Sequence, residues 1–69
     1  MEDYSKMYPF INNVAGVWIK YLPYLRFGQM MIIFLEDYEK RTGHDAWFLK
    51  EDEFFDEFKD FAKRYGRAQ

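Results

Sequence analysis

Carboxylates form the densest group of potentially reactive side chains in this 69-residue sequence. Acids in close array can bind a divalent cation or exchange protons with a substrate, so this group is the first candidate for chemistry. Its spacing does not match a calcium loop, which requires a glycine at the sixth position. On a helix these acids lie largely opposite an aromatic stripe, which indicates either a solvated face or a surface that attracts a basic partner. The group lies in residues 51–60, where Lys59 is the single base and the acids are Glu51, Asp52, Glu53, Asp56, Glu57 and Asp60.

The other side chains that enzymes use are almost missing. The sequence has no cysteine, and Ser5, Thr42 and His44 are the sole residues of their types. His44 and Asp45 are neighbours in the chain, but an active site needs a nucleophile, a base and a charge-stabilising group within mutual reach. One imidazole without thiolates is too few ligands for a structural zinc site, and Arg41 breaks the Glu-x-x-His signature of di-iron bundles. The sequence therefore predicts no enzyme activity, no metal site and no cofactor.

Charge and hydropathy bear on two further classes of partner. The net charge is −2, and the bases Lys63, Arg64 and Arg67 are explained more simply by helix-end complementarity than by phosphate contacts, so nucleic acid is not an expected partner. The uncharged stretch 27–35 has nine residues, whereas a membrane span needs about 20, so no membrane partner is expected. The acidic first residues lack the basic and apolar regions of a signal peptide, which predicts a cytoplasmic protein.

Apolar residues recur at helical spacing in a first segment. This helix should end near Tyr21, because Pro23 disfavours the α conformation at the residue before it. The apolar positions are spaced so that they share one helical face, which we expect to pack into the core. They are Ile11, Val14, Ala15, Trp18 and Leu22.

Two further helices are predicted over 26–42 and 51–65, each followed by a glycine that can end it. Between them, the short piece 47–49 is expected to be extended. With no cysteine available for disulfides, a chain of this length needs dense packing of its aromatic rings. The fold class is therefore predicted to be all-α: a single domain, 1–69, that forms a compact three-helix bundle.

The second predicted helix is apolar around nearly its whole circumference. Ile32 and Ile33 lie away from its main stripe, and a small bundle cannot cover every side of such a helix, so at least one of them should remain exposed. Either an N-terminal arm carrying Tyr4, Met7 and Tyr8 folds over them, or a second chain does. A homodimer and a groove for another protein both remain open.

Two stretches resemble a known family. Residues 18–29 read Trp-Ile-Lys-Tyr-Leu-Pro-Tyr-Leu-Arg-Phe-Gly-Gln, and an Asp-aromatic-acidic segment follows at 45–54. This pattern is similar to a family of short uncharacterised proteins of Gram-positive bacteria and their prophages that share a Pro-x-Leu-Arg-Phe-Gly-Gln core. The chain departs from the family at Tyr24, where an Asp is usual, and at Ala46, where a Pro is common. The resemblance implies a small helical protein and assigns no activity.

Together these observations favour a non-enzymatic protein-interaction module of bacterial or phage origin that could modulate a host protein. The alternatives are a phage-encoded inhibitor of host defence, of the anti-CRISPR type, and a self-associating structural protein. Arg26 is expected to bond a helix end or an acid such as Asp45, with a partner contact as its second interpretation. The candidate partner-binding residues are Asp56, Glu57, Asp60, Ile32, Ile33 and Arg26.

Overall fold

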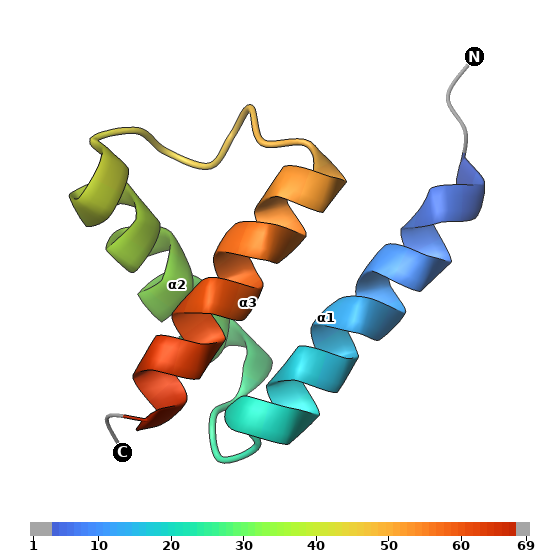
Figure 1. The fold of residues 1–69 in the computed structure, drawn as a ribbon, viewed down its shortest axis with the longest axis horizontal. Helices are drawn as coiled ribbons and strands as arrows, with labels where there is room; N and C mark the ends of the chain where they lie inside the picture. Colours follow the sequence, from blue (N-terminus) through green and yellow to red (C-terminus); the bar gives the residue numbers. More distant parts are fainter. Residues whose placement is uncertain (1–3, 68–69) are drawn as a thin grey trace.

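The computed structural model describes residues 4–67 and contains three α-helices (Figure 1). A single 3-10 turn, η1 (Tyr4–Lys6), leads into α1 (Met7–Tyr21). Helices α2 (Phe27–Thr42) and α3 (Glu51–Arg67) follow, and no strand occurs within 4–67. The predicted all-α three-helix bundle is confirmed.

Local sequence signals account for three of the helix ends but not for the end of α3. That helix continues through Gly66, which keeps a negative φ, to Arg67, so the prediction that this glycine would end the helix is wrong. Helix α1 ends at Tyr21, before Pro23, as predicted. Helix α2 begins where the backbone N–H of Arg26 donates to Oε1 of Gln29 at 3.0 Å, which satisfies one backbone donor at the helix start. The helix ends at Gly43, whose φ of 76° is left-handed and whose N–H donates to the carbonyl of Glu39 at 2.8 Å.

The segment between α2 and α3 is a turn, which differs from the extended conformation expected for 47–49. The N–H of Leu49 donates to the carbonyl of Ala46 at 3.1 Å, and that of Trp47 donates to Oδ1 of Asp45 at 3.1 Å. An aspartate side chain that binds the backbone two residues ahead favours a turn over an extended strand. The local chemistry of Asp45 thus outweighs the β propensity of the rings that follow.

Helix α3 holds the bundle together because it packs against both of the other helices. Figure 1 shows α1 and α3 running side by side in the same direction, whereas α2 is inclined steeply to both. No Cα atom of α1 lies within 8 Å of one in α2 in the described part of the chain, so these two helices approach each other only through side chains. Near the C-terminus α3 passes close to α1, since a Cβ at Gly66 would stand 3.1 Å from the carbonyl oxygen of Tyr21.

Phe34 of α2 lies at the centre of an aromatic core. Its side chain is fully buried, and its ring centroid lies 5.1 Å from that of Phe54 and 5.4 Å from those of both Phe58 and Phe61. These contacts join α2 to α3 through edge-on and tilted ring pairs, the geometries that aromatic pairs prefer. The other buried residues are Val14, Val17, Leu22, Met30, Tyr38 and Ala62.

Two glycine substitutions should change stability in opposite directions. Gly43→Ala is expected to lower the free energy of unfolding by about 1 kcal/mol, because alanine is strained at positive φ. Gly16→Ala, in the middle of α1 where a Cβ meets nothing within 4 Å, should raise it by about 0.5–1 kcal/mol. Urea unfolding followed by circular dichroism measures both, and a Gly43→Ala protein as stable as the parent would contradict this account of the α2 end.

Candidate functional site

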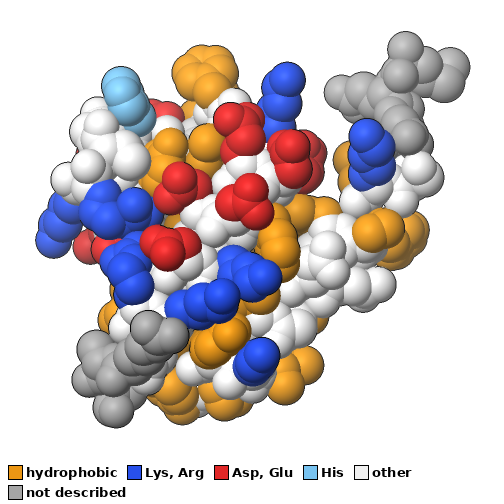
Figure 2. All heavy atoms as spheres, in the orientation of Figure 1, with side chains coloured by type: hydrophobic (Ala, Val, Ile, Leu, Met, Phe, Trp, Pro, Cys, Tyr) orange, Lys and Arg blue, Asp and Glu red, His pale blue; other side chains and the backbone are white. Residues whose placement is uncertain are grey.

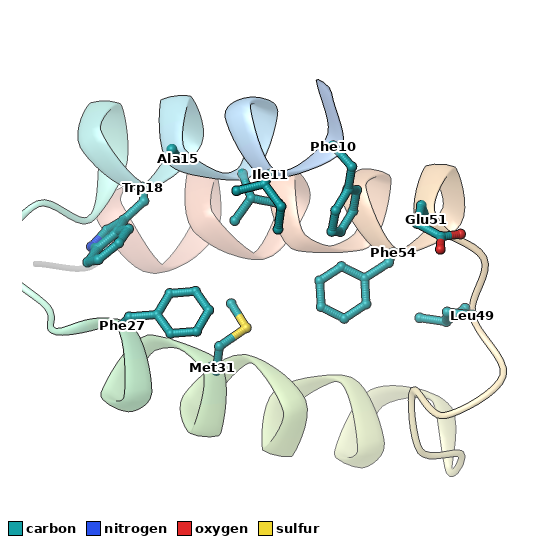
Figure 3. Close-up of a pocket in the computed structure, with 10 residues that line it drawn as sticks. Phe10, Ile11, Ala15, Trp18, Phe27, Met31, Leu49, Glu51 and Phe54 are labelled. Carbon is teal, nitrogen blue, oxygen red and sulfur yellow. The ribbon is translucent and has the colours of Figure 1, made fainter. Parts of the chain in front are cut away.

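An open apolar groove of about 400 Å³ separates α1 from α2 (Figure 3). The α1 and α2 side chains point toward each other across it, and Phe54 of α3 lies between the two walls. Apolar side chains form nearly the whole lining, and Glu51 is the single charged residue there. From α1 come Phe10, Ile11, Val14, Ala15 and Trp18; from α2, Phe27 and Met31; and from the following turn and α3, Leu49, Glu51 and Phe54.

Trp18 and Phe27 close one end of the groove. Their ring centroids lie 5.6 Å apart, and the indole N–H of Trp18 donates to the carbonyl of Leu25 at 2.9 Å. This hydrogen bond ties α1 to the connection before α2, so it fixes the distance between the two walls at this end. A wall held by a hydrogen bond loses little freedom when a ligand binds, which favours binding.

The opposite end of the groove is built by Phe10, Phe54 and Glu51. The rings of Phe10 and Phe54 meet edge-on at 5.8 Å, and Phe54 also contacts Phe34 in the core. Glu51 begins α3, where the helix macrodipole favours a negative charge. The groove therefore has a purely apolar aromatic end and an end that carries one carboxylate.

The groove remains open to solvent. Ile11 is 58% exposed and Phe27 is 51% exposed, although both line its walls. Burying such side chains is favourable in proportion to the apolar area removed from water. The free protein thus leaves unused a surface that a ligand could cover.

All three predicted acidic positions lie on α3, where Asp56 and Asp60 are exposed and Glu57 is half-buried, and two of them already have partners. Arg41 Nη2 donates to Oε1 of Glu57 at 3.2 Å, and Arg64 Nε donates to Oδ2 of Asp60 at 3.0 Å. Figure 2 shows the acidic side chains gathered on this face, with basic side chains bordering them to the left and below. Asp56 has no ion pair within the described residues. Because Glu57 and Asp60 are paired with arginines, the face carries less free negative charge than the sequence indicates.

The other predicted contact residues do not share one surface. Ile32 is 60% exposed, which confirms that at least one of the two isoleucines remains open, whereas Ile33 packs partly against the core. Met7 and Tyr8 do not form an arm over α2: they belong to α1 and are exposed. The side chain of Tyr4 lies outside the described residues.

Of the two kinds of partner expected for Arg26, the acid Asp45 forms no bond with it, and at the helix end the bond comes from the backbone N–H of Arg26, which donates to Gln29. Arg26 precedes α2 and Asp45 follows it, so the 16-residue helix separates them, and Asp45 accepts from the backbone of Trp47 instead. Within the described residues, the Arg26 side chain is exposed and forms no salt bridge. Its side chain therefore remains available for a partner contact.

An ion-pair network on Asp37 should give the fold a measurable acid sensitivity. Burial by itself raises the pKa of Asp37, but hydrogen bonds from Arg64 at 3.1 Å and Arg41 at 2.8 Å outweigh it and hold the pKa below its ordinary value. A lowered pKa means that the charged carboxylate stabilises the fold above its unfolded-state pKa and that this stabilisation is lost as the pH falls through the folded-state value.

Asp37→Asn should therefore be less stable than the parent near neutral pH, by up to about 1 kcal/mol because the site is partly exposed. This difference should shrink below about pH 4. Urea midpoints of both proteins near neutral pH and near pH 3 measure it. An equal difference at both pH values would exclude Asp37 as the source of the acid sensitivity.

In the described part of the chain, neither metal-binding side chains nor similarity to known proteins indicates a second functional site. Within residues 4–67, no group of three or more His, Cys, Asp or Glu side chains is placed to hold a metal ion. No helix in the described part of the chain is long and apolar enough to cross a bilayer. Comparison with protein-family models, curated proteins and solved structures found no match.

Proposed function

We propose that this chain is a protein-interaction module whose α1–α2 groove binds an amphipathic helix of a partner protein. The observation that supports this proposal is the open groove itself: two helices with no backbone contact, apolar facing walls and half-exposed lining residues. Docking of the apolar face of a helix into a hydrophobic groove is a common mode of peptide recognition. A fourth helix would cover the surface that a three-helix arrangement leaves open.

The lining favours a helix over a small metabolite. Small-molecule sites combine apolar walls with several placed polar groups that fix the orientation of the ligand. Glu51 is the one charged side chain that lines this groove, and the indole N–H of Trp18 is already bonded to Leu25. We therefore expect the partner helix to present an apolar stripe and a basic residue near the Glu51 end.

The acidic face of α3 is a weaker candidate for the main contact. Glu57 and Asp60 would have to exchange their bonds to Arg41 and Arg64 for a new partner, and exposed ion pairs of this kind contribute little energy. Asp56 can still attract a basic partner during approach. Given the resemblance of 18–29 to small bacterial and prophage proteins, the partner we propose is a host protein of the bacterial cytoplasm.

A peptide selection tests the proposal and does not require the partner protein to be identified. A displayed library of helical peptides, roughly 18 residues or about 27 Å long, covers the length of α1 or α2. We expect enriched peptides to carry apolar residues at i, i+3, i+4 and i+7 together with a base at one end. Enrichment of sequences without helical periodicity, or of none at all, would count against a helix-binding groove.

A further inference from the structure

Two adjacent aromatic rings project from the turn between α2 and α3. Trp47 is 82% exposed and Phe48 is 89% exposed. Large aromatic side chains with this much free surface act as anchors at protein interfaces, where they enter pockets and lose their contact with water. Neither ring belongs to the buried core, so the core does not need them.

Hydrogen bonds hold the backbone of the turn that carries these rings. Asp45 accepts the N–H of Trp47, and Leu49 bonds back to Ala46, so the backbone on both sides of the ring pair is constrained. Leu49, the next residue after Phe48, lines the end of the groove. A preorganised anchor loses little conformational entropy on binding.

The ring pair and the groove are complementary parts carried by one chain. The groove offers about 400 Å³ of apolar space, and its own loop leaves that space open because both rings point into solvent. Opposite charges accompany the two parts, since Lys50 follows the ring pair closely while Glu51 lines the groove.

We propose that two copies pair reciprocally, each inserting Trp47 and Phe48 into the α1–α2 groove of the other. A two-fold axis makes both insertions equivalent and closes the assembly at a dimer. Each ring can bury on the order of 150–250 Å². The four rings bury roughly 600–1,000 Å², and the groove walls that they cover add a similar area, which together reaches the range of about 1,200–2,000 Å² of stable interfaces.

This inference rests on the proposed function, because it assigns a regulation to the same groove. In the dimer the rings occupy the surface that a partner helix would use, so the helix and the second copy compete. Binding of a partner helix then separates the two copies. At high concentration, the protein without a bound partner helix therefore covers its apolar groove by pairing with a second copy.

Sedimentation across a hundredfold range of concentration tests the pairing. The parent chain should shift from monomer to dimer as concentration rises. The double variant Trp47→Ala/Phe48→Ala, which loses the rings, and Ala15→Arg, which blocks the groove, should each remain monomeric. A mixture of the two variants keeps one of the two insertions, so a heterodimer should form only at concentrations well above those at which the parent dimerises.

Tyr8→Ala is the matched control, since Tyr8 is 81% exposed on α1 but does not line the groove, and it should dimerise like the parent. A parent chain that stays monomeric, or a Trp47→Ala/Phe48→Ala or Ala15→Arg variant that dimerises like the parent, would overturn the reciprocal insertion. A selected helical peptide should bind Trp47→Ala/Phe48→Ala at least as tightly as the parent. That measurement reports on the groove alone, so failure of the helix-binding function is distinguishable from failure of the pairing.

Discussion

Replacing Phe34 with alanine should leave much of the chain unfolded at room temperature. Phe34 is fully buried and its ring contacts Phe54, Phe58 and Phe61, so the substitution removes the centre of the α2–α3 interface. Phe-to-Ala changes in a core cost about 3–5 kcal/mol. A domain of this size without disulfides has a free energy of unfolding of roughly 3–5 kcal/mol, so the substitution removes nearly all of it. Urea unfolding and far-ultraviolet circular dichroism measure the effect.

Phe27→Ala provides the control for this prediction. It removes the same side chain from the same helix, but Phe27 is 51% exposed and contacts Trp18 at the groove wall. We expect a cost of about 1 kcal/mol, as for a partly exposed position outside the core. If both substitutions destabilised the protein equally, the assignment of Phe34 as the centre of the core would be wrong.

Ala15→Arg should weaken the binding of a selected helical peptide by about 100-fold, equivalent to about 2.8 kcal/mol. Ala15 is a small side chain on the α1 wall of the groove. An arginine there would fill the space for the ligand helix, and its charge would have to be desolvated when that helix binds. The folded state should persist, since Ala15 is only partly buried and arginine is a good helix former. Isothermal titration calorimetry measures the affinity.

Gly16→Arg is the matched control for the groove variant. It adds the same side chain one residue further along α1, at an exposed position where a Cβ meets nothing within 4 Å and which does not line the groove. We expect peptide affinity within about threefold of the parent, under 1 kcal/mol. Equal losses for both variants would show that the added charge, rather than the blocked groove, disturbs binding.

Helix positions could be read from the sequence because their signals are local. Pro23 ends α1, Gly43 ends α2 through its left-handed conformation, and the acids at 51–53 start α3. Each of these signals acts within a few residues, so no tertiary information is needed. The exposure of at least one of Ile32 and Ile33 also followed from the pattern, because α2 has apolar residues on more sides than its neighbours can cover; the pattern did not say that it would be Ile32.

The groove could not be read from the sequence in the same way. Ile11, Ala15 and Trp18 have the periodicity of a buried stripe, and whether that stripe closes onto α2 depends on how α3 sets the two helices apart. The pairing of Arg64 with Asp37 joins residues 27 apart, which spacing within one helix cannot reveal. The turn at 46–49 depended on one side-chain bond from Asp45, a signal that the neighbouring aromatic residues obscured.

The two indole N–H groups of the chain offer the most direct test of a ligand-binding groove, since the sequence has two tryptophans. Trp18 lines the groove and its indole is bonded to Leu25, so two-dimensional proton–nitrogen NMR of Trp18 reports on the wall that a helix would cover. Titrating a selected helical peptide into labelled protein with the substitution Phe48→Ala, which retains both indoles, should shift the Trp18 signal saturably, while Ala15→Arg protein should need about 100-fold more peptide for the same shift. A peptide that binds and leaves the Trp18 signal unchanged would contradict the groove as the binding site.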